Sequence, residues 1–118
     1  MPGGDFEEMR GIFLSEVEAN TEALIVSSGF DFGGKHFALD LPSRQKWLAL
    51  KTLESALSWP CTISSTVGEF VLAEADLAAF LGSALSVVQG YKDSGRALRL
   101  ELEAATGHVD LMAFKDTR

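Results

Sequence analysis

A proline-free stretch at residues 73–106 constrains the fold most strongly, because its apolar residues recur at helical spacing. Nine of its positions step alternately by four and three residues: Leu77, Leu81, Ala84, Val88, Tyr91, Gly95, Leu98, Leu102 and Ala105. We call these nine positions the heptad seam, and it continues for about four repeats. The pattern predicts one long helix of about 45–50 Å, at 1.5 Å per residue.

Three glycines, Gly82, Gly90 and Gly95, lie inside this predicted helix. Each lowers helix propensity by about 1 kcal/mol relative to alanine, but each also allows another backbone to approach closely. These glycines could also break the helix between residues 92 and 95. A small sheet spans only about 20 Å along a strand, so part of the helix must pack on the N-terminal helix, on a partner or on a second copy. The sequence leaves these alternatives open, together with the simpler one that the helix packs along the sheet of its own domain.

The N-terminal residues predict a helix over residues 5–22. Asp5 is expected as its N-cap, with Glu8 completing a capping-box pair. One helical face carries apolar side chains, with Ile12 beside them: Phe6, Met9, Phe13 and Val17. From Ala23 the spacing changes to that of a strand, because residues 24–26 are apolar and partly β-branched.

Alternating residues then predict a hairpin, with a turn centred on Gly34 and Lys35. This turn would pair Phe32 with Phe37 and Phe30 with Leu39. A shift of the register by two residues would keep the same face inward. The opposite face, which carries Asp31 and Asp40, is expected to meet water.

A second hairpin is expected after a helix that opens at Ser43 and ends by Trp59, because Pro60 disfavours helix at the residue before it. The apolar side of this helix is predicted to hold Trp47, Leu48, Leu50, Leu53 and Leu57. The second hairpin pairs residues 61–65 with residues 69–72, with a turn near Val67 and Gly68.

The predicted fold class is therefore α+β: an N-terminal helix, then two β-hairpin–helix units that form a small antiparallel sheet with a long C-terminal helix. We predict an N-terminal helical segment over residues 1–23, an α+β domain over residues 24–106 and a C-terminal docking tail over residues 107–118. The tail holds four apolar residues that either fold back or dock on a neighbour: Val109, Leu111, Met112 and Phe114.

The composition of the chain limits the classes of partner that it can bind. The net charge is −7 and the basic residues are scattered, so we expect no nucleic-acid binding. No apolar run approaches the roughly 20 residues that cross a bilayer, and the first residues do not resemble a signal peptide, so we expect no membrane insertion. With one cysteine, Cys61, no intrachain disulfide can form, and we expect folding in a reducing cytoplasm.

No pattern predicts a catalytic, cofactor or metal site. His36 and His108 are far apart, and no cysteine or histidine spacing resembles zinc coordination. Cys61 follows a proline at a strand start, where a small buried thiol is the ordinary interpretation. No Gly-x-Ser-x-Gly motif or phosphate-binding loop is present. An enzyme of unrecognised type remains the third functional class, after the two described below.

Several motifs follow one another in a characteristic order over residues 24–106. They are Ser28-Gly29-Phe30-Asp31-Phe32, Phe37-Ala38-Leu39-Asp40, Ser43-Arg44-Gln45, Glu69-Phe70-Val71-Leu72, Ala75-Asp76-Leu77 and Leu102-Glu103-Ala104-Ala105-Thr106. This arrangement resembles a domain of unknown function that recurs in tailed-bacteriophage tail and tail-fibre proteins. The glycines inside the last helix depart from the usual pattern of that family.

The resemblance implies a non-enzymatic structural or adaptor protein of a tailed-phage virion, in the tail, the baseplate or the tail-fibre attachment. Its partners would be other tail or baseplate proteins, with a homo-oligomer also possible, and it would reach the virion after assembly in the host cytoplasm. The alternative is a tail-fibre assembly chaperone that is absent from the finished particle. The predicted partner interface is Tyr91, Leu98, Leu102, Val109, Leu111, Met112 and Phe114.

Overall fold

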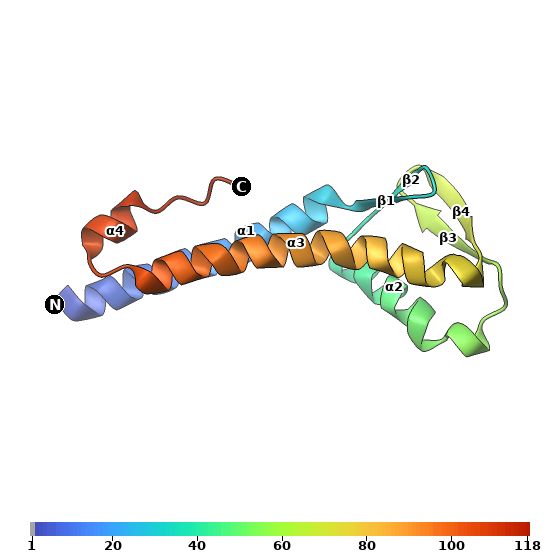
Figure 1. Ribbon diagram of the computed structural model, residues 1–118, viewed down its shortest axis with the longest axis horizontal. Helices are drawn as coiled ribbons and strands as arrows, with labels where there is room; N and C mark the ends of the chain where they lie inside the picture. The colour runs from blue at the N-terminus through green and yellow to red at the C-terminus, as the bar shows by residue number, and fades with distance from the viewer. Residues whose placement is uncertain (1) are drawn as a thin grey trace. The chain divides into compact units, whose positions relative to one another are not determined.

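The computed structural model describes residues 2–118, with the side chains from Phe6 onward except that of residue 108. Its elements in chain order are α1 (Pro2–Ser28), β1 (Phe30–Phe32), β2 (Lys35–Phe37), α2 (Leu41–Thr52), η1 (Glu54–Ala56), β3 (Cys61–Ser65), β4 (Gly68–Leu72), η2 (Glu74–Asp76), α3 (Leu77–Ala104) and α4 (His108–Ala113) (Figure 1). This mixture of helices and antiparallel hairpins confirms the α+β fold class.

The chain forms two compact units. Unit 1 consists of Met1–Ala23 and Gly90–Arg118, and unit 2 is Leu24–Gln89. The helices α1 and α3 each contribute residues to both units.

Helix α1 is longer than predicted at both ends. It begins at Pro2, so Asp5 lies inside the helix; the side chain of Asp5, and with it the proposed capping pair with Glu8, falls outside the described residues. The expectation of a strand from residue 24 is wrong, because these residues continue the helix and Ile25 is fully buried. Burial has overridden the weak strand preference of β-branched residues. The helix ends at Ser28, and the next residue, Gly29, has φ +57° and donates its N–H to the Ile25 carbonyl.

The first hairpin has the predicted inward face but a different register. Phe30 pairs with Phe37 and Phe32 pairs with Lys35, two residues away from the expected pairing. The turn consists of Gly33 and Gly34, whose φ values are +58° and +80°. A two-residue turn whose backbone matches the strand twist requires positive φ at both positions, and two glycines satisfy this without strain.

The second hairpin pairs Cys61 with Leu72 at one end and Ser65 with Gly68 at the other, so its turn lies one residue earlier than expected. The expectation that both hairpins join in one sheet is wrong, because each forms a separate two-stranded sheet. One backbone bond links them, from Thr66 N–H to the His36 carbonyl (2.8 Å). The next carbonyl on that side, of Ala38, instead accepts the indole N–H of Trp47 (3.0 Å).

Helix α2 begins two residues before Ser43, with Asp40 as the N-cap residue and Pro42 in the first turn. It ends at Thr52 and is followed by a short 3₁₀ turn, well before Trp59. Trp47 is buried as expected, but Leu48 and Leu53 are 67% and 49% exposed, so the apolar side was predicted too broadly. Asp31 is exposed as predicted, whereas Asp40 is half-buried.

Aromatic side chains form the centre of unit 2. Phe80 is fully buried, and its ring lies 5.1 Å from those of Phe30 and Phe37 and 5.2 Å from that of Trp47. The rings meet edge to face, the arrangement that their quadrupoles favour. Phe80 is not part of the heptad seam, although its spacing of three from the seam residue Leu77 places both on one helical face.

Helix α3 continues without a break through residues 92–95. All nine seam positions are buried or half-buried, which confirms the seam as a packing surface. At Gly95 an added Cβ would lie 2.6 Å from Thr21 Oγ1, so this glycine does permit a close approach in unit 1. At Gly82 and Gly90 a Cβ would meet nothing within 4 Å, so the same expectation is wrong for them.

We predict that Phe80→Ala lowers the free energy of unfolding by about 3–5 kcal/mol, because it removes the ring that the other aromatic side chains surround. Val71→Ala, at a position that is 61% exposed on β4, should change it by no more than about 0.5 kcal/mol. Urea unfolding followed by circular dichroism measures both. Equal midpoints for the two variants would contradict the central role of Phe80.

Candidate docking surface

The two helical segments of unit 1 run antiparallel (Figure 1). Arg10 on α1 donates to the Ala105 carbonyl after the end of α3 (2.6 Å), while Thr21, further along α1, lies against Gly95, earlier in α3. Later residues of α1 thus contact earlier residues of α3, as expected for antiparallel helices. The second half of the long helix is therefore covered by the N-terminal helix of the same chain.

A small hydrophobic core holds unit 1 together. Its buried members are Val17, Leu102, Ala105 and Leu111, and partly buried apolar residues pack around them: Phe6, Met9, Phe13, Leu14, Leu98 and Phe114. The rings of Phe13 and Phe114 lie 5.8 Å apart. This core joins α1, α3 and the C-terminal residues, so the predicted tail folds back onto its own chain.

Helix α4 is fixed at its start by an acidic side chain. The carboxylate of Asp110 accepts the backbone N–H of Thr106 (3.0 Å) and its hydroxyl (3.1 Å). These bonds lower the pKa of Asp110 below its ordinary value, with the backbone bond as the larger cause. The next residue, Leu111, enters the core and is fully buried.

Arg118 fastens the residues after α4. Its guanidinium donates to the Val17 carbonyl on α1 (3.2 Å) and, on α3, to the Tyr91 carbonyl (3.3 Å) and the Ser94 hydroxyl (3.0 Å). It also forms a 2.7 Å ion pair with Asp116. One side chain therefore bonds to both helices and to its own segment.

Asp116 completes this arrangement. Its carboxylate accepts bonds from Arg118 and from Asn20 (3.2 Å), and its side chain is 8% exposed. Donation by Arg118 is the main cause that lowers the pKa of Asp116 from 3.8 to about 2. The same bond raises the pKa of Arg118. The ion pair thus stabilises the charged form of both groups.

The structure separates the seven predicted interface residues into three groups. Leu102 and Leu111 are 1% and 0% exposed inside the core of unit 1, so they offer no surface to a partner in this fold. Three are half-buried: Leu98 and Phe114, which pack against this core, and Tyr91. Val109 and Met112 are 82% and 71% exposed.

Val109 and Met112 lie three residues apart on α4, and we call them the α4 outer face. Helical residues at this spacing are neighbours. The opposite side of the same helix carries the buried Leu111. A helix that is apolar on both sides is typically covered on both, so this arrangement identifies the α4 outer face as a candidate docking surface.

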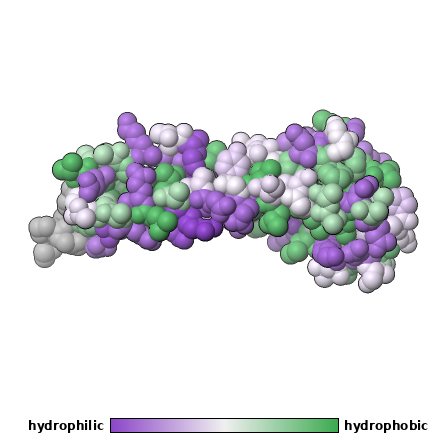
Figure 2. All heavy atoms as spheres, in the orientation of Figure 1, coloured by the Kyte–Doolittle hydropathy of each residue, from purple (hydrophilic) through white to green (hydrophobic). Residues whose placement is uncertain are grey.

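Two further apolar residues of unit 1 are exposed, and neither belongs to the predicted partner interface. Ile12 is 60% exposed in a shallow depression of α1, where it was expected beside the buried face, and Leu100 is 58% exposed on α3. On the face drawn in Figure 2, apolar side chains lie scattered among polar ones in this way. Helical spacing from the seam places Leu100 on the far side of α3, which was the available signal.

Other candidate chemistry is sparse. His36 Nδ1 lies 2.7 Å from Asp31 Oδ1 on the exposed side of the first hairpin. Cys61 is half-buried, where a buried thiol was expected, and its Sγ lies 3.2 Å from the Ser58 carbonyl. Among the described residues, no three His, Cys, Asp or Glu side chains gather as metal ligands would. The described helices include none with the length and apolar character of a membrane span.

Comparison with protein-family models, with curated protein sequences and with solved structures finds no match to this chain. The resemblance to the phage tail domain therefore rests on the motifs of residues 24–106 alone.

We predict that Asp116→Asn lowers the free energy of unfolding at neutral pH by on the order of 1 kcal/mol. Because the folded-state pKa of Asp116 lies below its ordinary value, its contribution is complete above about pH 4 and is lost as the pH falls toward 2. Urea unfolding at several pH values should show the wild type and the variant converging below pH 4.

Glu103→Gln is the matched control, because it removes one charge at an exposed position of α3. It should change the stability at neutral pH by no more than about 0.5 kcal/mol. A difference between wild type and Asp116→Asn that stays constant down to about pH 2 would contradict the assigned role of the ion pair.

Proposed function

We propose that this chain is a non-enzymatic structural or adaptor protein that acts through protein–protein contacts of the α4 outer face. The observation that carries the proposal is the exposure of Val109 and Met112 on a helix whose other side is fastened to the protein. Burial of such side chains by a partner contributes about 1.5–3 kcal/mol each.

The fastening of α4 matters because a helix this short is not stable alone in water. Leu111 in the core, Asp110 at the helix start and Arg118 beyond it hold the segment in one place. The α4 outer face is therefore ordered before it binds. Such pre-organisation reduces the entropy cost of association and so favours affinity.

We further propose that the partners are tail or baseplate proteins of a tailed phage and that the protein resides in the virion. The support for this setting is the resemblance of residues 24–106 to a domain of phage tail and tail-fibre proteins. In a particle built of repeated subunits, contact with a second copy of this chain is also expected.

The alternative is a tail-fibre assembly chaperone that leaves before the particle is complete. The observation that favours it is the small size of the α4 outer face, which consists of two side chains. Stable interfaces usually bury about 800 Å² on each partner, and a smaller apolar contact suits a reversible one.

We predict that the double variant Val109→Ser, Met112→Gln is lost from purified particles, while its free energy of unfolding changes by less than about 1 kcal/mol. The variant removes the apolar surface without touching the core. Quantitative mass spectrometry of purified particles, set against the unfractionated lysate, measures the ratio of the protein to each tail protein.

Leu100→Ser is the matched control, because Leu100 is also exposed on unit 1 but lies on α3. It should remain in particles at the wild-type ratio. Wild-type protein that is abundant in the lysate and absent from particles would favour the chaperone. Retention of the double variant at the wild-type ratio would contradict docking through α4.

A further inference from the structure

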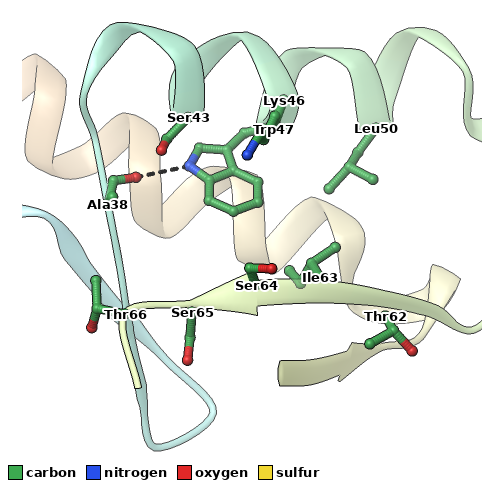
Figure 3. Close-up of a pocket in the computed structure, with 10 residues that line it drawn as sticks. All are labelled: Ala38, Ser43, Lys46, Trp47, Leu50, Thr62, Ile63, Ser64, Ser65 and Thr66. Atoms are coloured by element: carbon green, nitrogen blue, oxygen red, sulfur yellow. Dashed lines mark hydrogen bonds between the residues drawn. The ribbon is translucent and has the colours of Figure 1, made fainter. Parts of the chain in front are cut away.

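A groove of about 400 Å³ lies between α2 and β3 in unit 2 (Figure 3). Helix α2 contributes one face to it, since the lining residues Ser43, Lys46, Trp47 and Leu50 are three to four positions apart. On the other side the groove is lined by residues 62–66, and Ala38 closes one end. The proposed docking through α4 does not use this groove.

The residues that β3 contributes to the lining indicate that the groove follows the edge of this strand. Side chains of a strand point alternately to its two faces, so a pocket over one face contacts alternate residues. Here five consecutive residues, 62–66, line the groove. Such continuous contact is expected where a groove runs along the edge, beside the backbone itself.

The backbone groups on this edge are available for hydrogen bonding. In an antiparallel strand, alternate residues direct their N–H and C=O groups to alternate edges. Thr66 donates its N–H to His36, away from β4, so Ser64 and Thr62 direct their groups the same way. In the part of the chain that the structure describes, neither makes a backbone bond outside the β3–β4 ladder.

The first hairpin bonds to this edge through the His36 carbonyl, and the bond from Trp47 to the next carbonyl accounts for the end of the pairing there. After His36, the next carbonyl on the same side belongs to Ala38, and the indole N–H of Trp47 takes it. The chain then enters α2 at Leu41. Figure 3 shows the indole between Ala38 and the groove, with α2 and β3 on opposite sides. The ladder between the hairpins stops after one bond, and the rest of the β3 edge stays open.

We propose that the groove binds an extended polypeptide segment, which adds to β3 as a strand and places an acidic side chain beside Lys46. An added strand supplies the alternating donors and acceptors that Thr62 and Ser64 lack. A bound helix would leave these groups without partners. Leu50 and Ile63 offer apolar contacts to side chains of the added strand, and Lys46 is the charged residue of the lining.

The first experiment uses displayed random peptides of about ten residues, selected on the full-length protein. Selection runs in parallel on Ser64→Pro and on the control Ser64→Ala. Proline removes the Ser64 N–H from the outer edge and spares the β3–β4 ladder, while alanine keeps it. Peptides should be enriched on the wild type and on Ser64→Ala, should carry an acidic residue at a fixed position, and should bind Ser64→Pro about tenfold more weakly.

The second experiment needs no protein variant and so remains decisive if Ser64→Pro does not fold. An enriched peptide is resynthesised with N-methyl groups on alternate amides, in two versions that block opposite edges. One version should bind about tenfold more weakly and the other should retain its affinity, because an added strand bonds through one edge. Lys46→Gln should weaken the parent peptide about threefold or more.

Three results would overturn the proposal. They are failure of any peptide to be enriched on the wild type over Ser64→Pro, equal binding of both N-methylated versions, and a wild-type dimer that Ser64→Pro converts to a monomer in sedimentation. The last would assign the edge to a second copy of the chain. Loss of the α4 outer face leaves this groove intact, so the two proposals can fail independently.

Discussion

The indole of Trp47 is the group on which the arrangement of unit 2 depends. Its ring packs against Phe37 and Phe80 in the aromatic core, and its N–H bonds to the Ala38 carbonyl. A buried indole N–H needs an acceptor, and Ala38 lies just beyond β2. The same bond that satisfies the tryptophan therefore ends the ladder between the hairpins. Core packing and the open edge of β3 are two consequences of one side chain.

Local patterns in the sequence predict some parts of this unit, whereas tertiary contacts such as that of Trp47 determine others. Alternation of apolar and polar residues specifies the face of a strand, and the faces of the first hairpin are as expected. Register depends on the turn, where Gly33 and Gly34 both have positive φ, and a run of two glycines and a lysine leaves the centre of the turn ambiguous. The separation of the sheets depends on Trp47 reaching Ala38, a tertiary contact that no local pattern encodes.

The docking residues were only partly predictable for a related reason. The heptad seam identifies the face of α3 that must be covered, but the pattern is the same whether a partner or the same chain covers it. Leu102 meets Val17 in the core of unit 1, and Leu111 joins them from the tail. With these two residues used internally, Val109 and Met112 are the fully exposed members of the predicted interface. Helical spacing places Val109 and Met112 on one face of α4 and Leu111 on the other. Once Leu111 is known to be buried, the other two residues must be exposed.

The charge of the chain adds a constraint on any partner of the β3 edge. At −7 the protein repels an acidic segment at a distance, whereas Lys46 attracts it within the groove. At physiological salt, interactions beyond about 8 Å are largely screened, so the repulsion weakens more than the contact does. Association with an acidic segment should therefore become faster as salt rises from a low level, the opposite of electrostatic steering. The choice among peptide segments then depends on the backbone hydrogen bonds to β3 and on the charge of Lys46. The groove therefore favours an otherwise uncharged segment that carries one acidic residue at a fixed position.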